Sequence, residues 1–338
     1  MIILSIESSC DETAAALTQD GRQVLSSVIH SQVDIHTLYG GVVPELASRS
    51  HIQAVSRLAA LALQEAGLSR REIDAVAVTY APGLIGAVLV GVNFAKAAAL
   101  RLGVPLIPVH HIRGHIAANY LAFPELEPPF LCLVVSGGHT MILAVEDYTR
   151  TRILGGTRDD AAGECFDKVA RVLGMPYPGG AALDRTARQG VEGRYDLPRA
   201  KLSGNPLDMS FSGLKTAALN LIHHAGQVGE ALNIPDLCAD FSRAVSDTLV
   251  PRTMQALRDT GYKKLAIAGG VAANSRIRAD FAAAAAEAGA ALYIPPLSLC
   301  GDNAAMIGAQ GYYEYLAGNT AGQDLNAYAT KTLEGEAV

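Results

Sequence analysis

Cysteine is scarce in this 338-residue sequence, and no cysteine stands in a metal-binding or disulfide pattern. The cysteines are odd in number, lie far apart and form no C-x-x-C pair: they are Cys10, Cys132, Cys165, Cys238 and Cys300. This usage argues against a disulfide framework and against a structural zinc knuckle. It indicates a reducing compartment, and we therefore expect a cytoplasmic protein.

Long apolar runs are also missing. No run reaches about 18 residues, the length needed to cross a bilayer, without a polar break. The N-terminal residues 1–7 contain no basic side chain and already include Glu7, so they do not resemble a secretory signal. The sequence predicts no association with a membrane and no export.

A surplus of positive charge is absent as well. The chain has 27 basic and 33 acidic side chains, a net charge of −6 at pH 7. Phosphate neutralisation supplies most of the affinity of a stand-alone nucleic-acid binder, so nucleic-acid binding here needs a local basic surface or a partner. A solvated face balanced by nearby carboxylates is the simpler explanation of either basic cluster taken singly. The two densest clusters are Arg150, Arg152 and Arg158, and Arg185, Arg188, Arg194, Arg199 and Lys201.

Two enzyme motifs are absent. The pattern G-x-x-x-x-G-K-[ST] occurs nowhere, which excludes a P-loop ATPase. A zinc endopeptidase of the H-E-x-x-H type needs a glutamate directly after its first histidine. Ile112 follows His111 in this sequence, so the general base of such a peptidase is missing.

The residues that are present predict a duplicated α/β protein. Half of the residues are hydrophobic, and the length suggests about two domains. Residues 2–17 and 130–145 each consist of two apolar runs around a polar turn, which predicts two β-hairpins. Residues 75–111 and 264–302 each predict a β-turn-α-β unit with the continuous apolar strands of a buried parallel sheet.

The duplication predicts a domain organisation. We expect an N-terminal lobe of residues 1–110 plus about 305–330, and a C-terminal lobe of residues 111–304 with an insertion at about 184–208. Ligands of open α/β sheets collect at the carboxyl ends of the strands. If the lobes face each other, both hairpin turns and both glycine turns meet in one interlobe cleft, together with His111 and Asp302.

His111 and His115 form a candidate metal-binding pair. Their i,i+4 spacing places both imidazoles on one face of a helix, although two histidines that pack or cap a helix would have the same spacing. Asp302 is expected at the matching strand end of the other lobe and would complete a two-histidine, one-carboxylate set. Such a set suits Fe(II) or Zn(II).

Glycine turns after two strands are candidate nucleotide sites. The turns at 136–140 and 269–274 would let the backbone approach a phosphate or a purine face, although ordinary tight turns have the same composition. Asp167 is expected on a helix capped by Asp160 and ended by Gly174. Its carboxylate could hold ribose hydroxyls or be a solvated partner of a neighbouring lysine.

Six motifs in this order resemble the family of catalytic subunits of bacterial tRNA threonylcarbamoyladenosine (t6A) synthesis, once described as O-sialoglycoprotein endopeptidases. The resemblance extends from residue 1 to about residue 320. The motifs are Glu7–Thr13, Ala81–Leu84, His111-x-x-x-His115, Val135–Thr140, Phe211–Thr216 and Gly269–Asn274.

The resemblance implies the fold and the reaction. The fold would be that of actin, Hsp70 and sugar kinases, with two ribonuclease-H-like lobes around a cleft. The reaction would move a threonylcarbamoyl group from threonylcarbamoyl-adenylate to the N6 amine of the adenosine 3′ to the anticodon. The tRNAs would be those reading codons that begin with A, and AMP would leave. Two alternatives remain: an ATP-dependent small-molecule kinase and a nucleotide-gated scaffold of the same fold.

The resemblance also implies roles for individual residues. His111, His115 and Asp302 would hold one Fe(II), with Zn(II) as the alternative. The chemistry of the reaction, and not the resemblance, suggests the proton acceptor: we expect Asp11 or His139 to take or orient the amine proton, because both lie on hairpin turns that face the presumed cleft, although Asp11 has the alternative of an Asx turn. The residues implied in adenylate binding are Val135, Ser136, Gly137, Gly138, His139, Asp167, Gly180, Asp184 and Asn274.

The implied partners are tRNA, a smaller paralogous subunit of the same fold and a small P-loop ATPase. The paralogue would dock on helices of the first lobe. The apolar stretch 52–63 is a candidate docking face, and it is equally compatible with a core-facing helix.

Overall fold

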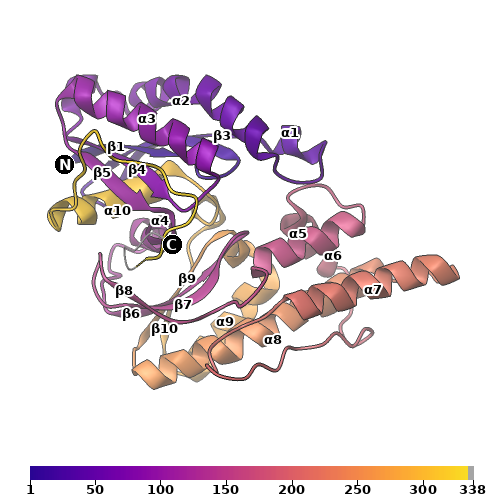
Figure 1. Ribbon diagram of the computed structural model, residues 1–338. Coiled ribbons are helices and arrows are strands. Elements are labelled where there is room, and N and C mark those ends of the chain that lie inside the picture. The colour runs from indigo at the N-terminus through magenta and orange to yellow at the C-terminus, as the bar shows by residue number, and fades with distance from the viewer. Residues whose placement is uncertain (334–338) are drawn as a thin grey trace. The chain divides into compact units, whose positions relative to one another are not determined.

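The first β-sheet of the computed structural model, which describes residues 1–333, contains the first predicted hairpin. Strands β1 (Ile2–Glu7) and β2 (Glu12–Gln19) are antiparallel, and β3 (Gln23–Ser31) pairs antiparallel with β2. On the other side of β1, β4 (Ala75–Ala81) and β5 (Leu106–His110) continue the sheet in parallel. The strand order is β3-β2-β1-β4-β5 (Figure 1).

The second sheet repeats this order. Its strands are arranged in the order β10-β9-β6-β7-β8. Read in the opposite direction, β8, β7, β6, β9 and β10 correspond in turn to β3, β2, β1, β4 and β5 of the first sheet. The predicted hairpin joins β6 and β7 antiparallel, and β9 runs parallel to both β6 and β10. The predicted α/β duplication is therefore confirmed at the level of sheet topology. The strands are β6 (Phe130–Val135), β7 (Thr140–Val145), β8 (Thr151–Gly156), β9 (Lys264–Ala268) and β10 (Ala291–Tyr293).

The chain forms two units. Among the described residues, unit 1 comprises Met1–Pro128, Glu146–Arg152 and residues 295–333, and unit 2 comprises Pro129–Val145 and Ile153–Ile294. The helices of unit 1 are α1 (Val33–Thr37), α2 (Pro44–Ala66), η1 (Arg70–Glu72), α3 (Ile85–Leu102), α4 (His111–Ala122), η3 (Leu297–Leu299) and α10 (Ala304–Leu316). Those of unit 2 are α5 (Ala162–Val172), α6 (Gly179–Ala187), α7 (Ser212–Val228), α8 (Ile234–Thr260), η2 (Gly270–Ala273) and α9 (Ser275–Glu287).

Helices cover both faces of the first sheet. Alternate residues of a strand point to opposite faces, so Leu4 of β1 packs with α2 and α3, whereas Ile3 packs with α10. Figure 1 shows α2 and α3 together over one face of this sheet. Of the candidate docking stretch 52–63, Ile52 is exposed, but Val55, Leu58 and Ala59 belong to the core, as the alternative of a core-facing helix predicts.

Among residues 1–333, only α3 is long and apolar enough to cross a membrane, with a mean hydropathy of 1.5 over 18 residues. The core helix of a soluble protein meets the same criterion. Val88, Val92 and Ala95 of α3 are buried in the cluster that lies against the first sheet. This packing accounts for the apolar residues on the buried face of α3, whereas Ile85, Leu89 and Leu100 are exposed.

The boundary between the units differs from the predicted one. It lies at 128/129 instead of 110/111, because α4 packs against α10 and therefore belongs to unit 1. Residues 146–152 join unit 1 for a similar reason. The Tyr148 ring stacks on Tyr313 with a centroid separation of 3.8 Å, and Gln310 donates a hydrogen bond to the Tyr148 carbonyl. The return from unit 2 comes at 294/295, earlier than expected.

The irregular segment in unit 2 begins later than predicted. Helix α6 runs to Ala187, so the first residues of the expected insertion at 184–208 are helical. The segment beyond it is anchored to α8, where the Asp240 carboxylate accepts hydrogen bonds from the backbone N–H groups of Gly193 and Tyr195, at 2.7 Å each.

The prediction that Asp160 caps the N-terminus of α5 is wrong. Asp160 does not cap the helix, because its carboxylate pairs with Lys215 and Lys168. Instead, the Thr140 hydroxyl of β7 accepts a hydrogen bond from Ala162 N–H at 2.9 Å. This contact ties the first turn of α5 to the β6–β7 hairpin.

Gly269 closes the turn after β9 in a conformation that other residues avoid. Its φ is +95°, and a Cβ there would lie 2.4 Å from the Val135 carbonyl oxygen. Gly269→Ala is expected to lower the free energy of unfolding by about 2 kcal/mol or more, measured by denaturant titration. Gly289→Ala is the matched control, because its φ of +64° is similarly strained and no atom lies within 4 Å of its Cβ position. Equal losses in the two variants would contradict a steric role for Gly269.

Candidate functional site

The predicted histidine pair lies at the start of α4. His111 is the first residue of the helix, and the His110 side chain caps it by accepting a hydrogen bond from Ile112 N–H. The i,i+4 spacing brings the imidazole centroids of His111 and His115 to 4.6 Å. Both side chains are buried. The helix therefore presents two imidazoles on one face, as predicted.

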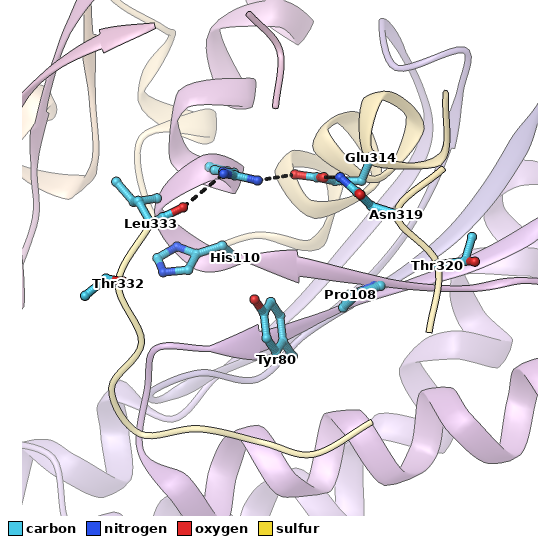
Figure 2. A pocket seen from close by; sticks show the side chains of 9 residues that line it. Tyr80, Pro108, His110, Glu314, Asn319, Thr320, Thr332 and Leu333 are labelled. Carbon is cyan, nitrogen blue, oxygen red and sulfur yellow. Dashed lines mark hydrogen bonds and ion pairs between the residues drawn. The ribbon is translucent and has the colours of Figure 1, made fainter. Parts of the chain in front are cut away.

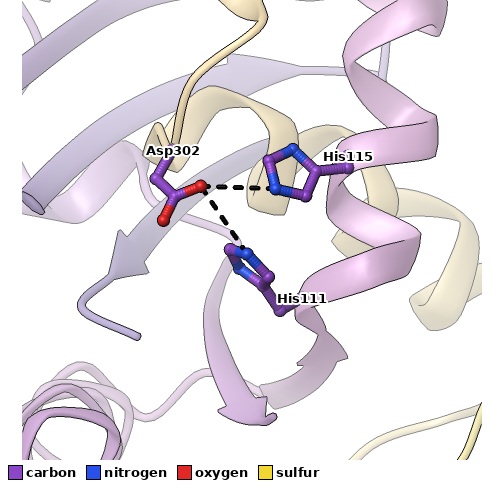
Figure 3. A group of neighbouring side chains, drawn as sticks. All are labelled: His111, His115 and Asp302. Carbon is purple, nitrogen blue, oxygen red and sulfur yellow. Dashed lines mark ion pairs between the residues drawn. The ribbon is translucent and has the colours of Figure 1, made fainter. Parts of the chain in front are cut away.

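Asp302 joins this pair. It lies just before Asn303, whose side chain caps α10 by accepting a hydrogen bond from Met306 N–H at 2.9 Å. Asp302 Oδ1 is 3.6 Å from His111 Nε2 and 3.3 Å from His115 Nε2 (Figure 3). Asp302 was expected in the other lobe, but the packing of α10 against α4 places it in unit 1 with the histidines.

The donor set fits a divalent cation. One donor atom from each of His111, His115 and Asp302 lies within 4.8 Å of the others. Both ring nitrogens of His115 are buried and make no hydrogen bond to the described residues. Two imidazoles and one carboxylate with open positions suit Fe(II) or Zn(II).

His111 lies beside two carboxylates, those of Asp302 and Glu7. Burial alone would lower the pKa of this imidazole, but the carboxylates of Asp302 and Glu7 raise it to about 9. Burial alone would raise the pKa of Glu7, and the opposing effect of His111 lowers it below its usual value. A cation coordinated by Nε2 would replace the proton that the carboxylates otherwise hold on His111.

Asp11, one of the two candidate proton acceptors, lies in the turn between β1 and β2. It is buried, and burial together with the charges of Asp11 and Asp302 raises the pKa of the adjacent Glu12 to about 9. His51 of α2 supports this turn through hydrogen bonds to the Cys10 carbonyl at 2.9 Å and the Thr13 hydroxyl at 2.7 Å. The structure thus places Asp11 in the same unit as the metal ligands.

The candidate adenylate residues all belong to unit 2. In the β6–β7 turn, Ser136 N–H donates to the His139 carbonyl at 2.8 Å, and His139 N–H donates to Ser136 Oγ at 3.1 Å. Gly137 and Gly138 are exposed, and a Cβ at either position would meet no atom within 4 Å. Nothing within the described residues therefore requires glycine at these two positions, whereas an approaching ligand would.

Hydrogen bonds connect the remaining adenylate candidates. Asp167 of α5 accepts from Gly180 N–H of α6 at 2.9 Å. Four residues further along α6, Asp184 accepts from Ser275 N–H at 3.0 Å, next to Asn274, which caps α9. Asp184 thereby joins the second turn of α6 to the first turn of α9. Gly163 at the start of α5 also donates to the Ser136 carbonyl, so α5 contacts the glycine turn.

The two arginine clusters are largely neutralised. Arg150 and Arg152 both pair with Glu146, and Arg158 pairs with Asp208. In the other cluster, Arg188, Arg194 and Arg199 pair with Asp184, Asp236 and Asp247. These pairs match a solvated face balanced by carboxylates.

A separate polar cavity of about 320 Å³ lies beside the first turn of α4 (Figure 2). The C-terminal segment forms part of its wall, because the Lys331 carbonyl faces His110 Nε2 at 3.0 Å and Arg113 donates to the Leu333 carbonyl. No predicted site residue lines this cavity. Its lining consists of Tyr80, Pro108, His110, Arg113, Glu314, Asn319, Thr320, Thr332 and Leu333.

Sequence reasoning assigned no role to three side chains at the unit 1 site: Glu7, Glu12 and His51. Glu7 and Glu12 stand in the motif 7–13, but nothing in the motif shows that Glu7 is buried against His111. His51 lies about 40 residues away on a helix that the sequence presents only as an apolar stretch. Only their long-range hydrogen bonds reveal them.

Comparison with known proteins gives consistent matches. The family model for tRNA N6-adenosine threonylcarbamoyltransferase matches residues 23–309. A protein of that name from Moorella thermoacetica is 54% identical over 325 residues, covering 96% of this chain and 95% of the relative. One from Caldicellulosiruptor saccharolyticus is 49% identical and covers 97% of each chain.

Solved structures share the fold at low sequence identity. Component A of (R)-2-hydroxyglutaryl-CoA dehydratase from Acidaminococcus fermentans is 15% identical, with a TM-score of 0.55 over 94% of this chain and 99% of that one. HypF from T. kodakarensis is 15% identical, with a TM-score of 0.61 over 96% of this chain and 48% of the other. These likenesses show a shared fold and agree with the predicted duplicated lobes.

Proposed function

The chain belongs to the family of tRNA N6-adenosine threonylcarbamoyltransferases, and from this premise we propose that it transfers a threonylcarbamoyl group to the N6 amine of an adenosine in tRNA. The observation that carries the proposal is the extent of the match, because relatives about 50% identical cover nearly the whole chain and therefore both units. A match confined to one unit would support only a shared fold.

The donor we propose is threonylcarbamoyl-adenylate, and the acceptor is the adenosine 3′ to the anticodon in tRNAs that read codons beginning with A. The N6 amine of adenine is a weak nucleophile, so the acyl group must arrive as a mixed anhydride. A bond forms between N6 and the carbamoyl carbon, the bond from that carbon to the phosphate oxygen breaks, and AMP leaves. One proton is lost from the amine. Catalysis thus requires orientation and stabilisation of charge on the oxygens.

Unit 2 offers the groups for the adenylate. The exposed turn of Gly137 and Gly138 provides backbone N–H groups without side chains, which suits the phosphate. Val135, Ser136 and His139 complete the turn. For the nucleoside, we propose the set of Asp167, Gly180, Asp184 and Asn274, which the hydrogen bonds among α5, α6 and α9 hold in place.

Unit 1 offers the metal site. We propose that His111, His115 and Asp302 hold one Fe(II), or Zn(II) in its place. A cation bound there would supply Lewis-acid polarisation of an acyl or carboxylate oxygen. The two histidines would fix the position of the cation, because both are buried side chains at the start of α4.

The proton of the amine needs an acceptor. We propose Asp11 or His139, which lie on the two hairpin turns. Asp11 is the buried candidate and His139 the more accessible one.

Partners complete the proposal. The net charge of −6 and the paired arginines leave little free positive surface among these clusters, so tRNA binding is expected to depend on other subunits. We propose a smaller paralogous subunit, docked on the α2 and α3 side where Ile52, Ile85 and Leu89 are exposed, and a small P-loop ATPase. The reaction belongs in the cytoplasm.

The transfer assay tests this function directly. The purified chain is incubated with threonylcarbamoyl-adenylate and unmodified tRNA, with cell extract supplying partners, and the nucleosides are analysed by mass spectrometry. Threonylcarbamoyladenosine is expected as the product. No product even with extract present would overturn the proposal in favour of a small-molecule kinase or a nucleotide-gated scaffold.

Asp11→Ala is expected to lower the transfer rate by about 100-fold, the usual contribution of a general base, while leaving metal content unchanged. His139→Ala in the same assay identifies which of the two residues accepts the proton. Full activity of Asp11→Ala would remove this residue from the mechanism and leave it as a residue of the turn.

A further inference from the structure

Glu7 is a buried carboxylate to which the proposed mechanism gives no role. It is the last residue of β1, its exposed fraction is 0%, and it lies in the interior of unit 1. Burying a carboxylate is costly unless hydrogen bonds compensate for the lost water. The contacts of Glu7 therefore indicate the role of this carboxylate.

Two contacts anchor the Glu7 carboxylate, and a third reaches the first residue of α4. Oε1 accepts a hydrogen bond from Ser9 N–H at 2.5 Å. Oε2 accepts from the Thr79 hydroxyl at 2.5 Å and lies 3.1 Å from His111 Nδ1. Thr79 stands near the end of β4, the parallel neighbour of β1, so two strand ends and the following turn fix the carboxylate.

The contact with Nδ1 decides which nitrogen of His111 is available. An ionised carboxylate only accepts hydrogen bonds, so Glu7 requires a proton on Nδ1 and leaves the lone pair on Nε2. Nε2 is the nitrogen that faces Asp302. Ser9 Oγ also lies 3.2 Å from Nδ1, and a hydroxyl could donate there as well as accept. Ser9 alone would therefore not select the tautomer.

We propose that Glu7 is a positioning residue for the metal site, holding the His111 ring and its Nδ1 proton so that Nε2 is directed at the cation. The proposal rests on the metal site proposed above. The two histidines differ in this respect, because the ring nitrogens of His115 make no hydrogen bond to the described residues. Loss of such a partner of a metal-bound histidine typically weakens metal binding by about 10- to 100-fold.

The experiment measures Zn²⁺ binding to the full-length, metal-stripped chain by competition with a chromophoric chelator. Glu7→Gln preserves the size of the side chain and removes its charge, and its Kd is expected to rise about 10- to 100-fold. The ¹⁵N spectrum of Zn²⁺-loaded histidine-labelled protein reports the tautomer. The signal of a protonated Nδ1 at His111 is expected in the wild type and is expected to weaken in Glu7→Gln.

Glu314→Gln is the matched control. Glu314 is also buried in unit 1, but its carboxylate accepts from Arg113, Gln310 and Asn319 instead of from a metal ligand. It should leave the Zn²⁺ affinity and the His111 signal unchanged. An equal loss of affinity in both glutamine variants would overturn the proposal, because a general loss of packing would then explain it.

The outcomes separate the proposals. A wild-type chain that binds no Zn²⁺ would overturn the metal site itself, whereas tight binding by both wild type and Glu7→Gln would overturn only the role of Glu7. Should Glu7→Gln fail to fold, Thr79→Val removes one anchor of the carboxylate and keeps its charge. A several-fold weaker Zn²⁺ affinity in Thr79→Val supports the proposal, and an unchanged affinity contradicts it.

Discussion

Replacing His111 and His115 together with alanine is expected to abolish tight metal binding and transferase activity. The double variant removes both imidazoles and leaves Asp302 as the single donor of the set. Because loss of an outer partner of a ligand already costs about 10- to 100-fold in affinity, loss of two ligands should cost well over 100-fold. Metal content of the purified protein and the rate of threonylcarbamoyladenosine formation measure the two effects.

The control is a second pair of histidines. His223 and His224 are exposed on α7 in unit 2, so their double alanine variant makes the same chemical change outside the site. It should bind metal and transfer the group as the wild type does. A double variant of His111 and His115 that kept its metal and its full rate would refute the assignment of both residues.

The second large effect is expected at the glycine turn between β6 and β7. Replacing Gly137 and Gly138 with alanine places two methyl groups where no described atom lies within 4 Å, so the fold should tolerate them within about 1 kcal/mol. The methyl groups would occupy the space through which a phosphate reaches the backbone N–H groups. The kcat/KM for threonylcarbamoyl-adenylate is expected to fall by about 100-fold.

Two measurements distinguish binding from folding in this variant. Denaturant unfolding should give a nearly unchanged free energy, and the transfer assay should show the loss. Gly226→Ala in the exposed part of α7 also adds a methyl group to open space; it should leave the transfer rate unchanged and raise the free energy of unfolding by at most about 1 kcal/mol, because alanine favours a helix over glycine. A double glycine variant with normal kcat/KM would contradict phosphate binding at this turn.

The local elements of the fold were predictable because each depends on neighbouring residues. Apolar runs around short polar turns define both hairpins, and the i,i+4 spacing defines the shared face of His111 and His115. The six ordered motifs identified the family, and relatives at about 50% identity confirm it.

Predictions failed where a longer-range contact competed with the local pattern. Aspartate is a residue type that commonly caps helices, and Asp160 lies just before α5. Its carboxylate is instead bound by Lys215, more than 50 residues later in the chain. The boundary at 110/111 followed the end of a repeat unit, yet the packing of α4 on α10 moves it to 128/129. Neither contact can be predicted from the residues that are adjacent to it in the sequence.

The sequence by itself determined the duplicated strand pattern, the paired imidazoles and the glycine turns, because hydrophobic periodicity and residue spacing act over a few residues. Only the tertiary structure decided that Asp302 stands beside His111 and that Glu7 is buried against the same ring. Those contacts join residues roughly 100 to 190 positions apart, and the packing of α10 on α4 and the pairing of β1 with β4 bring their elements together.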